Sequence, residues 1–401
     1  MKTMVKPETQ ITPSSLTAMV KAVLPEVIEM RRHLHRHPEL SGQEEQTARF
    51  VFEKCAQLGI SIRTDIGGHG LLAQLKADHA DEWVALRADM DALPIHDAKS
   101  CSYASQTDGI SHACGHDAHT AMLLGAMMIL KQLPQELPFH VACVFQPAEE
   151  LTTGAAAMLA DGLFSVIQPR RIHALHVYPY LPSGSIGMRA GPMCAAADMF
   201  EVEISGHGGH AARPHECTDV ILVASHIIQA LHHIVSRKVD PMDPAVLTVG
   251  HIEAGHAANV IPDCVRFSGT VRSLNPDTHE AMRKRMDRII RQTAETWGAV
   301  AHFDMTSAAP VLYNDPAIVE KAEVWLRNYL PDTPLINIDE PSMGGEDFAE
   351  FLQLTPGCLL RLGTGNTPET RYPLHHPCFD IDEAAMAAGI GALVSLCLGN
   401  Q

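Results

Sequence analysis

Residues 141–150 have the sequence VACVFQPAEE, in which an unbroken apolar run leads to two adjacent carboxylates, Glu149 and Glu150. Apolar runs this short are typical of strands covered on both faces, as in the central sheet of an α/β protein. Comparable runs occur at residues 71–75, 83–86 and 172–177. The sequence therefore predicts buried strands whose ends carry polar side chains.

Helical patterns alternate with these predicted strands. They cover residues 28–35, 43–59, 118–133 and 154–161. Alternation of this kind predicts an α/β layered domain in which a central mixed sheet is covered by helices. In such domains catalytic side chains collect at strand ends and in loops.

A different order of elements follows between residues 188 and 305. Predicted strands at 199–204, 246–252, 265–271 and 300–305 are interrupted by predicted helices at 218–235 and 276–297. This β-α-β-β-α-β order is that of ferredoxin-like α+β domains. We therefore expect residues 1–187 and 306–401 to form the layered domain and residues 188–305 to form a second domain inserted into it.

The composition argues against some classes of partner. The formal net charge is −17, from 30 Lys and Arg against 47 Asp and Glu, whereas nucleic acids and anionic membranes bind basic surfaces. The first residues show no signal-peptide pattern, and the apolar helical stretch 118–133 is too short to span a bilayer. The ten cysteines form no Cys-x-x-Cys pair, which favours reduced thiols in the cytoplasm.

Residues 112–119, HACGHDAH, hold the densest group of metal-binding side chains. Gly115 separates Cys114 from His116 and leaves the backbone free to bring a thiolate and an imidazole to one metal ion. The segment leads into a predicted helix, whose amino-terminal end is expected to lower the pKa of Cys114. A lone cysteine is more often a packing residue, but the surrounding histidines favour a metal site.

The adjacent carboxylates Glu149 and Glu150 suit a division of labour. One would bind a metal ion while the other moves a proton between water and the leaving amine. Alone, such a pair is more often a solvated helix start. Because adjacent side chains on an extended segment point to opposite faces, both reach one site only if the backbone bends. His176 and His375 are further candidate ligands, although either alone would more often be structural.

Other catalytic signatures are absent from the sequence. It contains no Gly-x-Ser-x-Gly elbow, no His-Glu-x-x-His helix and no Walker-type phosphate loop. Residues 68–73 match Gly-x-Gly-x-x-Ala, but a predicted strand follows the glycines, so we interpret them as a turn. Of the catalytic types considered, the residues therefore favour one that uses a metal site.

Nine ordered segments, from about residue 30 to the carboxyl terminus, resemble the metal-dependent aminoacylase/carboxypeptidase family. They are RRHLHRHPELSGQEEQT (31–47), LRADMDALPI (86–95), HACGHDAHTAMLLGAM (112–127), FQPAEE (145–150), GHGGHAARPH (206–215), ANVIPD (258–263), GTVRS (269–273), GGEDFA (344–349) and LHHPCFDIDE (374–383). The similar branch is the amidohydrolase branch, which holds hippurate hydrolases, N-acyl-amino-acid amidohydrolases and auxin–amino-acid conjugate hydrolases.

The resemblance implies two divalent metal ions per subunit, with zinc, manganese, cobalt and nickel all open as the element. The implied ligands are Cys114, His116, Glu150, His176 and His375, with the Cys114 thiolate bridging the pair. Glu149 would be the general base and acid, and Asp89 would orient a metal-ligating histidine.

The resemblance also implies that the inserted domain is a lid and dimerisation domain of a homodimer. His210 would stabilise the oxyanion across the dimer interface. Asn259 and Arg272 would grip the substrate carboxylate, a task that suits the arginine fork. Gly344 lies in a loop expected to shape the pocket for the acyl group.

The implied function is hydrolysis of the amide bond of small N-acyl amino acids by a cytoplasmic enzyme without nucleic-acid or membrane partners. A dipeptidase or carboxypeptidase using the same site stays open, because its substrates also present a carboxylate beside the scissile amide. A catalytically inactive metal-containing binding protein and a purely structural metal protein are further alternatives. Glu149, a proton carrier, argues against the first, and structural zinc sites are closed by four protein ligands.

Overall fold

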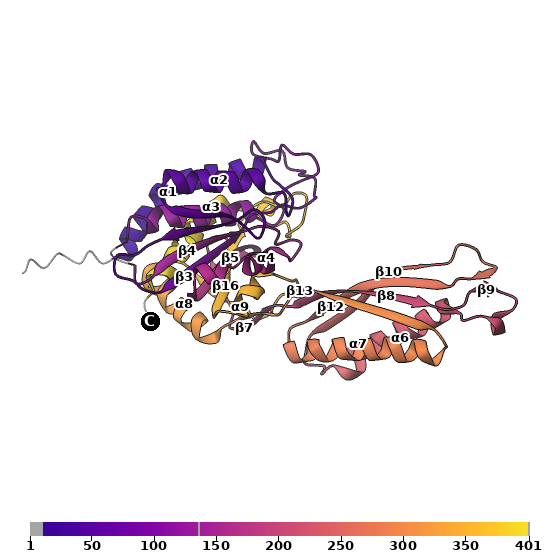
Figure 1. Cartoon of the computed structure of the whole chain (residues 1–401). Coiled ribbons are helices and arrows are strands. Elements are labelled where there is room, and N and C mark those ends of the chain that lie inside the picture. Colours follow the sequence, from indigo (N-terminus) through magenta and orange to yellow (C-terminus); the bar gives the residue numbers. More distant parts are fainter. Residues whose placement is uncertain (1–10, 135–136, 400–401) are drawn as a thin grey trace, which may run out of the picture. The chain divides into compact units, whose positions relative to one another are not determined.

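An eight-stranded mixed sheet forms the centre of the first of two units in the computed structural model, which describes residues 11–134 and 137–399 (Figure 1). The first unit contains residues 11–191, 313–340 and 350–399, and the second contains residues 192–312 and 341–349. In sheet order the strands are β1 (Ser61–Ile66), β2 (Gly70–Leu75), β4 (His140–Gln146), β3 (Trp83–Asp89), β5 (Pro169–Pro182), β16 (Gly357–Gly365), β6 (Ile186–Met188) and β15 (Leu335–Asn337).

The four central strands of this sheet are parallel. Strand β3 pairs with β4 on one side and with β5 on the other, and β5 pairs with β16. Asp89, the last residue of β3, lies opposite Gln146, the last residue of β4. The carboxyl ends of neighbouring parallel strands therefore meet at one edge of the sheet, where ligands bind in α/β folds.

Helices cover this sheet, so its central strands are almost wholly buried. They are α1 (Pro13–Arg36), α2 (Glu45–Gln57), α3 (His116–Leu130), α4 (Gly154–Ala160), α5 (Leu163–Val166), α8 (Pro316–Tyr329), α9 (Phe348–Leu352) and α10 (Met386–Leu398), with single 3₁₀ turns at Pro368–Thr370 and Glu383–Ala385. Helix α3 packs against α1, α10 and β3, and all but one of its residues are buried. The predicted α/β layered class is confirmed.

Helix α1 is longer than the sequence pattern predicted. It begins at Pro13 behind a Thr12 cap, and Ser15 completes a capping box with Thr12. Its buried stripe runs from Leu16 to Leu34. The prediction recognised only the second half of this helix, because Pro25 interrupts the pattern.

The second unit has the predicted ferredoxin-like arrangement. Its sheet has the order β10 (Ala245–Ala254), β12 (Cys264–Ser273), β8 (Ala196–Ser205) and β13 (Val300–Ala309), and all of its pairs are antiparallel. Helices α6 (Val220–Lys238) and α7 (Pro276–Thr296) contribute buried side chains to the core of this unit. Smaller elements are β9 (Gly209–His210), β11 (Val260–Ile261) and a 3₁₀ turn at Pro214–Glu216, and the strands where the chain passes between the units are β7 (Gly191–Cys194) and β14 (Leu312–Asn314).

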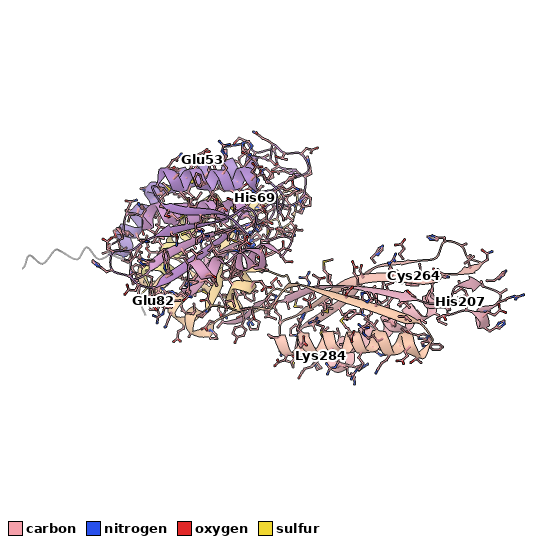
Figure 2. The ribbon with its side chains drawn as sticks, viewed as in Figure 1. Glu53, His69, Glu82, His207, Cys264 and Lys284 are labelled. Carbon is pink, nitrogen blue, oxygen red and sulfur yellow. The ribbon has the colours of Figure 1, made fainter. Side chains whose placement is uncertain are left out.

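The two helices of the second unit are amphipathic. Helix α7 buries Met282, Met286 and Ile290 at helical spacing, whereas Lys284 is exposed and pairs with Glu280 at 3.2 Å (Figure 2). Among the described residues, α6 alone has the length and apolar composition of a possible membrane span. Its buried side chains belong to the core of the second unit, as expected of a core helix.

Candidate metal centre

Five side chains predicted as metal ligands converge at the carboxyl edge of the first unit's sheet. They come from the loop before α3, from the first residue of α3, from the turn after β4, from β5 and from the loop before the 3₁₀ turn at Glu383–Ala385. In one group the ligand atoms of Cys114, His116 and His176 lie within 4.8 Å of one another, and in a second group those of Cys114, Glu150 and His375 do so. Cys114 is common to both groups.

His176 presents one ring nitrogen to this cluster. Its Nε2 lies 3.5 Å from Sγ of Cys114, while its Nδ1 lies 2.7 Å from the carbonyl oxygen of Val177. A proton on Nδ1, donated to that carbonyl, leaves the Nε2 lone pair directed at the cluster. Burial and His119 lower the pKa of His176 well below its usual value, which keeps the ring in the neutral form that metal ions bind.

Asp91, which the sequence reasoning missed, supports two of the candidate ligands. Its Oδ1 lies 3.1 Å from Nδ1 of His116, and its Oδ2 accepts the backbone N–H of Glu150 at 2.9 Å and the hydroxyl of Ser41 at 2.7 Å. The signal was available in the sequence, because alternate residues of an extended segment lie on one side, and Asp91 follows Asp89 at that spacing.

Asp89 was expected to orient a metal-ligating histidine, and the structure places its carboxylate elsewhere. Its Oδ1 lies 2.6 Å from Nδ1 of His119 and its Oδ2 accepts from Arg87 at 2.6 Å. The Nε2 of His119 accepts the N–H of Val177 at 2.9 Å. Both nitrogens of His119 are thus engaged, which leaves the ring without a lone pair for a cation. Asp89 therefore orients the ring of His119, and Oδ2 of Asp89 is 3.7 Å from Nε2 of His116.

The chain bends between the end of β4 and the two acidic residues. Ala148, which lies between Gln146 and Glu149, has φ of 50°, in the left-handed region that residues with a Cβ rarely adopt. As a result both carboxylates face one imidazole: Oε2 of Glu149 lies 4.0 Å from Nε2 of His116, and Oε1 of Glu150 lies 3.8 Å from it. This is the bend that a shared site requires.

The structure distinguishes between the two adjacent histidines of the carboxyl-terminal loop. Nε2 of His375 lies 3.5 Å from Oε1 of Glu150, and its backbone N–H donates to Ala113 at 2.8 Å. His375 also has a left-handed φ of 66°. The ring of His376 instead stacks on Tyr372 at 4.5 Å. His375 is therefore the member of the pair that joins the cluster.

The charges around the cluster fit cations. Burial alone would lower the pKa of His116, but Asp89 and Asp91 raise it to about 10. The buried Nε2 of His116 and Oε1 of Glu150 have no hydrogen-bond partner within the described residues, although such atoms in proteins are rarely left unsatisfied. A thiol, imidazoles and carboxylates together form a donor set that suits divalent transition metals.

The expected effect of the helix on Cys114 is wrong for the protein without cations. Burial and the carboxylates of Glu150 and Glu149 raise the pKa of the Cys114 thiol well above its usual value. Burial and these negative charges together outweigh any lowering by the end of α3, since both disfavour the thiolate. Ionisation of this thiol requires a compensating positive charge, which bound cations would supply.

A buried ion network adjoins the cluster, and the sequence reasoning did not identify it. The guanidinium of Arg31 is fully buried and lies 2.7 Å from Oδ2 of Asp117, 2.7 Å from Oδ1 of Asp380 and 3.1 Å from Oε1 of Glu383. His35 also lies 2.7 Å from Asp117, the neighbour of His116. The 31–47 segment that carries part of the family resemblance thus contacts segments that bear the candidate ligands.

The remaining predicted site residues belong to the second unit. His210 is exposed in β9, where it pairs with Val260, and Arg272 lies in β12 opposite Val246. Asn259 is exposed, and its carbonyl accepts the N–H of Ala211 at 3.1 Å. The exposed Gly344 donates its N–H to Ser342 at 3.0 Å. Their roles toward a substrate stay predictions.

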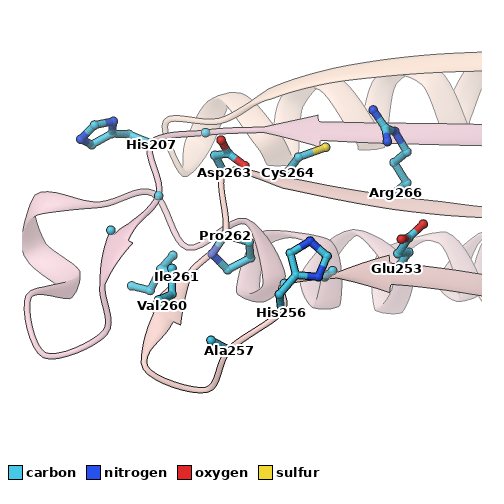
Figure 3. A pocket seen from close by; sticks show the side chains of 15 residues that line it. His207, Glu253, His256, Ala257, Val260, Ile261, Pro262, Asp263, Cys264 and Arg266 are labelled. Atoms are coloured by element: carbon cyan, nitrogen blue, oxygen red, sulfur yellow. The ribbon is translucent and has the colours of Figure 1, made fainter.

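A pocket of about 680 Å³ occupies the end of the second unit that carries β9 and β11. His207, His256 and Asp263 are among its lining residues, together with the glycines of the 206–209 segment (Figure 3). None of the five candidate ligands is among the residues that line it.

Comparisons with known proteins agree with this chemistry. Residues 85–398 match the family model of peptidase family M20/M25/M40. The chain is 40% identical to an N-acetyl-L-cysteine deacetylase of Bacillus subtilis, over 90% of this chain and 85% of that protein. It is 33% identical to thermostable carboxypeptidase 2 of Saccharolobus solfataricus, over 95% of this chain and 98% of that protein.

A solved structure is also similar. It is that of the Bacillus subtilis protein YXEP, a dinuclear metal-binding peptidase of the M20 family, with a TM-score of 0.82 and 34% identity over 94% of this chain and 98% of that one. The matched segments include every residue of the cluster from Asp89 to His375. The chain therefore belongs to peptidase family M20/M25/M40, and it is a metal-dependent hydrolase that acts on amide bonds.

Proposed function

We propose that the protein hydrolyses the amide bond of N-acyl amino acids, using two divalent cations per subunit. The ligands would be Cys114, His116, Glu150, His176 and His375. The observation that carries this proposal is the sharing of Cys114 by two groups of potential ligand atoms, with the carboxylate of Glu149 beside them. Among the relatives, one is named as a deacetylase of N-acetyl-L-cysteine.

The chemistry divides between the cations and Glu149. Cations held by the five ligands would act as Lewis acids, which bring the pKa of water toward neutrality and polarise a carbonyl group. Glu149 would take the proton that the attacking water loses and return it to the leaving nitrogen. Its side chain is only 9% exposed, so bulk water is largely kept from competing for that proton.

The neighbouring residues hold these groups in place. Asp91 would keep the proton on Nδ1 of His116, so that Nε2 is the ligating atom. Val177 does the same for His176 through its carbonyl oxygen. The pair Asp89 and His119 would support both the cluster and the backbone of β5.

The second unit would complete the site in a homodimer. On the motif resemblance, His210 of a second copy would donate to the oxyanion, and Asn259 and Arg272 would bind the substrate carboxylate. Gly344 would lie against the acyl group. Removal of one oxyanion donor typically costs about 3–4 kcal/mol in the barrier. We also propose that the protein acts in the cytoplasm, on small-molecule substrates.

A substrate screen tests the proposal. The protein is stripped of metal, reconstituted separately with zinc, manganese, cobalt and nickel, and assayed on N-acetyl, N-benzoyl and indole-acetyl amino acids and on dipeptides. The proposal is supported if the parent protein hydrolyses N-acyl amino acids and Glu149→Gln does not, although this variant still binds cations. Turnover of peptides alone would favour the carboxypeptidase alternative, for which one relative is named. Full activity in Glu149→Gln would refute the proposed role of this residue.

A further inference from the structure

Glu44 is a fully buried carboxylate that lies outside the set of predicted ligands. It occupies the position immediately before helix α2. Its Oε1 accepts the backbone N–H of Ala148 at 2.8 Å, whereas Oε2 is buried without a hydrogen-bond partner within the described residues. Burying a carboxylate is costly unless it is paired or hydrogen-bonded. Because the burial of Glu44 has this energetic cost and Glu44 contacts the turn that carries Glu149 and Glu150, we expect a functional role for this residue.

The partner of Glu44 is the residue that makes the bend. Ala148 has φ of 50°, and its carbonyl oxygen accepts N–H groups from Thr153 at 3.3 Å and from Gly154 at 3.2 Å. Alanine disfavours the left-handed region because its Cβ approaches the backbone too closely. Such a conformation persists only where the surroundings impose it, and it is concentrated at functional sites.

The bend decides where the next two side chains point. In an extended segment Glu149 and Glu150 would face opposite ways. With Ala148 left-handed, both lie within 4.0 Å of Nε2 of His116. The backbone N–H of Glu150 is held in turn by Asp91 at 2.9 Å.

We propose that Glu44 is a positioning residue, which holds Ala148 in its left-handed conformation and thereby directs Glu149 and Glu150 to the same metal centre. This proposal rests on the proposed function. It gives a role to the 31–47 segment, because Ser41 of the same segment donates to Asp91 at 2.7 Å. Two contacts from one segment thus support the two acidic residues.

The test compares side chains at position 44 that can accept a hydrogen bond from Ala148 with side chains that cannot. Glu44→Gln keeps an oxygen that can accept the N–H of Ala148, whereas Glu44→Leu has a similar volume and no acceptor. Glu45→Leu is the matched control, since Glu45 is the next residue and is exposed. Each variant is assayed for kcat and KM on an N-acyl amino acid that the parent protein hydrolyses, and for cation affinity by competition with a chelator.

We expect Glu44→Leu to lower kcat at least about tenfold with KM within about twofold, as expected for a group that acts only in the transition state. Its cation affinity should fall about 10–100-fold, because Glu150 is no longer held in place. Glu44→Gln and Glu45→Leu should stay within about threefold of the parent in kcat and in cation affinity. A Glu44→Leu protein with parental kcat and parental cation affinity would overturn the proposal, and so would a Gln variant as impaired as the Leu variant.

A second substitution separates positioning from a general loss of structure. Ala148→Gly removes the Cβ that penalises the left-handed conformation, so adding it to Glu44→Leu should restore kcat about fivefold relative to Glu44→Leu alone. No recovery would count against the proposal. If Glu44→Leu does not fold, Glu44→Asp replaces it in every arm with the same expectations, because its carboxylate is one methylene too short to reach Ala148.

Glu149→Gln, measured in parallel, separates a failure of the proposed catalytic role of Glu149 from a failure of the positioning role of Glu44. If Glu149→Gln is inactive and Glu44→Leu matches the parent, the proposed function stands and the positioning role falls. If Glu149→Gln keeps parental turnover, the proposed role of Glu149 as proton carrier falls, and the cation affinity of Glu44→Leu still decides the positioning role.

Discussion

Oδ1 of Asp91 lies 3.1 Å from Nδ1 of His116, and the other oxygen of the same carboxylate accepts the backbone N–H of Glu150 at 2.9 Å. One buried side chain therefore holds one candidate ligand from the first turn of α3 and another from the turn after β4. Loss of a carboxylate that fixes the tautomer of a ligating histidine typically lowers metal affinity about 10–100-fold.

Replacement of Asp91 should weaken metal binding without unfolding the protein. We expect Asp91→Ala to lower cation affinity about 10–100-fold, because His116 loses the group that orients its ring. The affinity is measured by chelator competition. Asp108→Ala is the control, since the Asp108 side chain is 97% exposed and pairs with the also exposed ring of His96 rather than with a candidate ligand. Equal affinities in the two variants would contradict the role of Asp91.

Arg31 should be essential for stability. Its buried guanidinium contacts three carboxylates, so Arg31→Met leaves buried negative charge without a partner and should lower the free energy of unfolding by about 3–5 kcal/mol. Arg49→Met, which removes an exposed pair with Glu53 on α2, should cost less than about 1 kcal/mol. Denaturant titration measures both, and a loss below about 1 kcal/mol for Arg31→Met would refute the prediction.

His173 should make the protein less stable in mild acid. Burial and the nearby Arg171 lower the pKa of His173 well below its usual value. Below about pH 6.5 the unfolded chain binds a proton there that the folded chain does not, so stability falls as the pH falls, by about 1.4 kcal/mol per pH unit from this group.

His173→Leu removes that contribution and should flatten the dependence of unfolding free energy on pH between about 6.5 and 5.5. His79→Gln, at an exposed position, serves as the control and should keep the parental slope. The prediction fails if His173→Leu and the parent protein lose stability equally over this pH range.

A mixing experiment tests the proposed dimer. Alone, Glu149→Gln and His210→Ala should each lose at least about 100-fold in kcat. If His210 serves the site of a second copy, mixed dimers of the two variants contain one site with both intact residues. If the subunits of the two variants are dissociated, mixed and allowed to pair at random, half of the dimers are mixed, and each mixed dimer has one intact site of two. Mixing should then restore up to about a quarter of the parental activity. Absence of any recovery in confirmed mixed dimers would show that His210 does not act across an interface.

Most of the fold could be predicted from the sequence, because the periodicity of apolar residues indicates which side chains are buried. The runs at 141–145 and 172–177 became parts of the central strands β4 and β5, and the order of elements in the second unit was correct. Strand β1 was missed. It lies at the edge of the sheet with most of its residues exposed, so it lacks the apolar pattern that identified β2, β3, β4 and β5.

The site was accessible only in part. Ligand types and motif spacing identified Cys114 and the residues that gather around it. The supporting contacts depend on backbone conformations that no motif reveals, such as the left-handed Ala148 and the pairing of Glu44 with it. The pKa of Cys114 was expected to be lowered by its helix, and the carboxylates brought near it by the fold reverse that direction.

In the proposed metal centre, Cys114 joins two cation sites. Crystals of the protein reconstituted with zinc, with data collected on both sides of the zinc absorption edge, test it directly. We expect two anomalous peaks, one beside His116 and His176 and the other beside Glu150 and His375, with Sγ of Cys114 between them. A single peak, or peaks away from this sulfur, would contradict it.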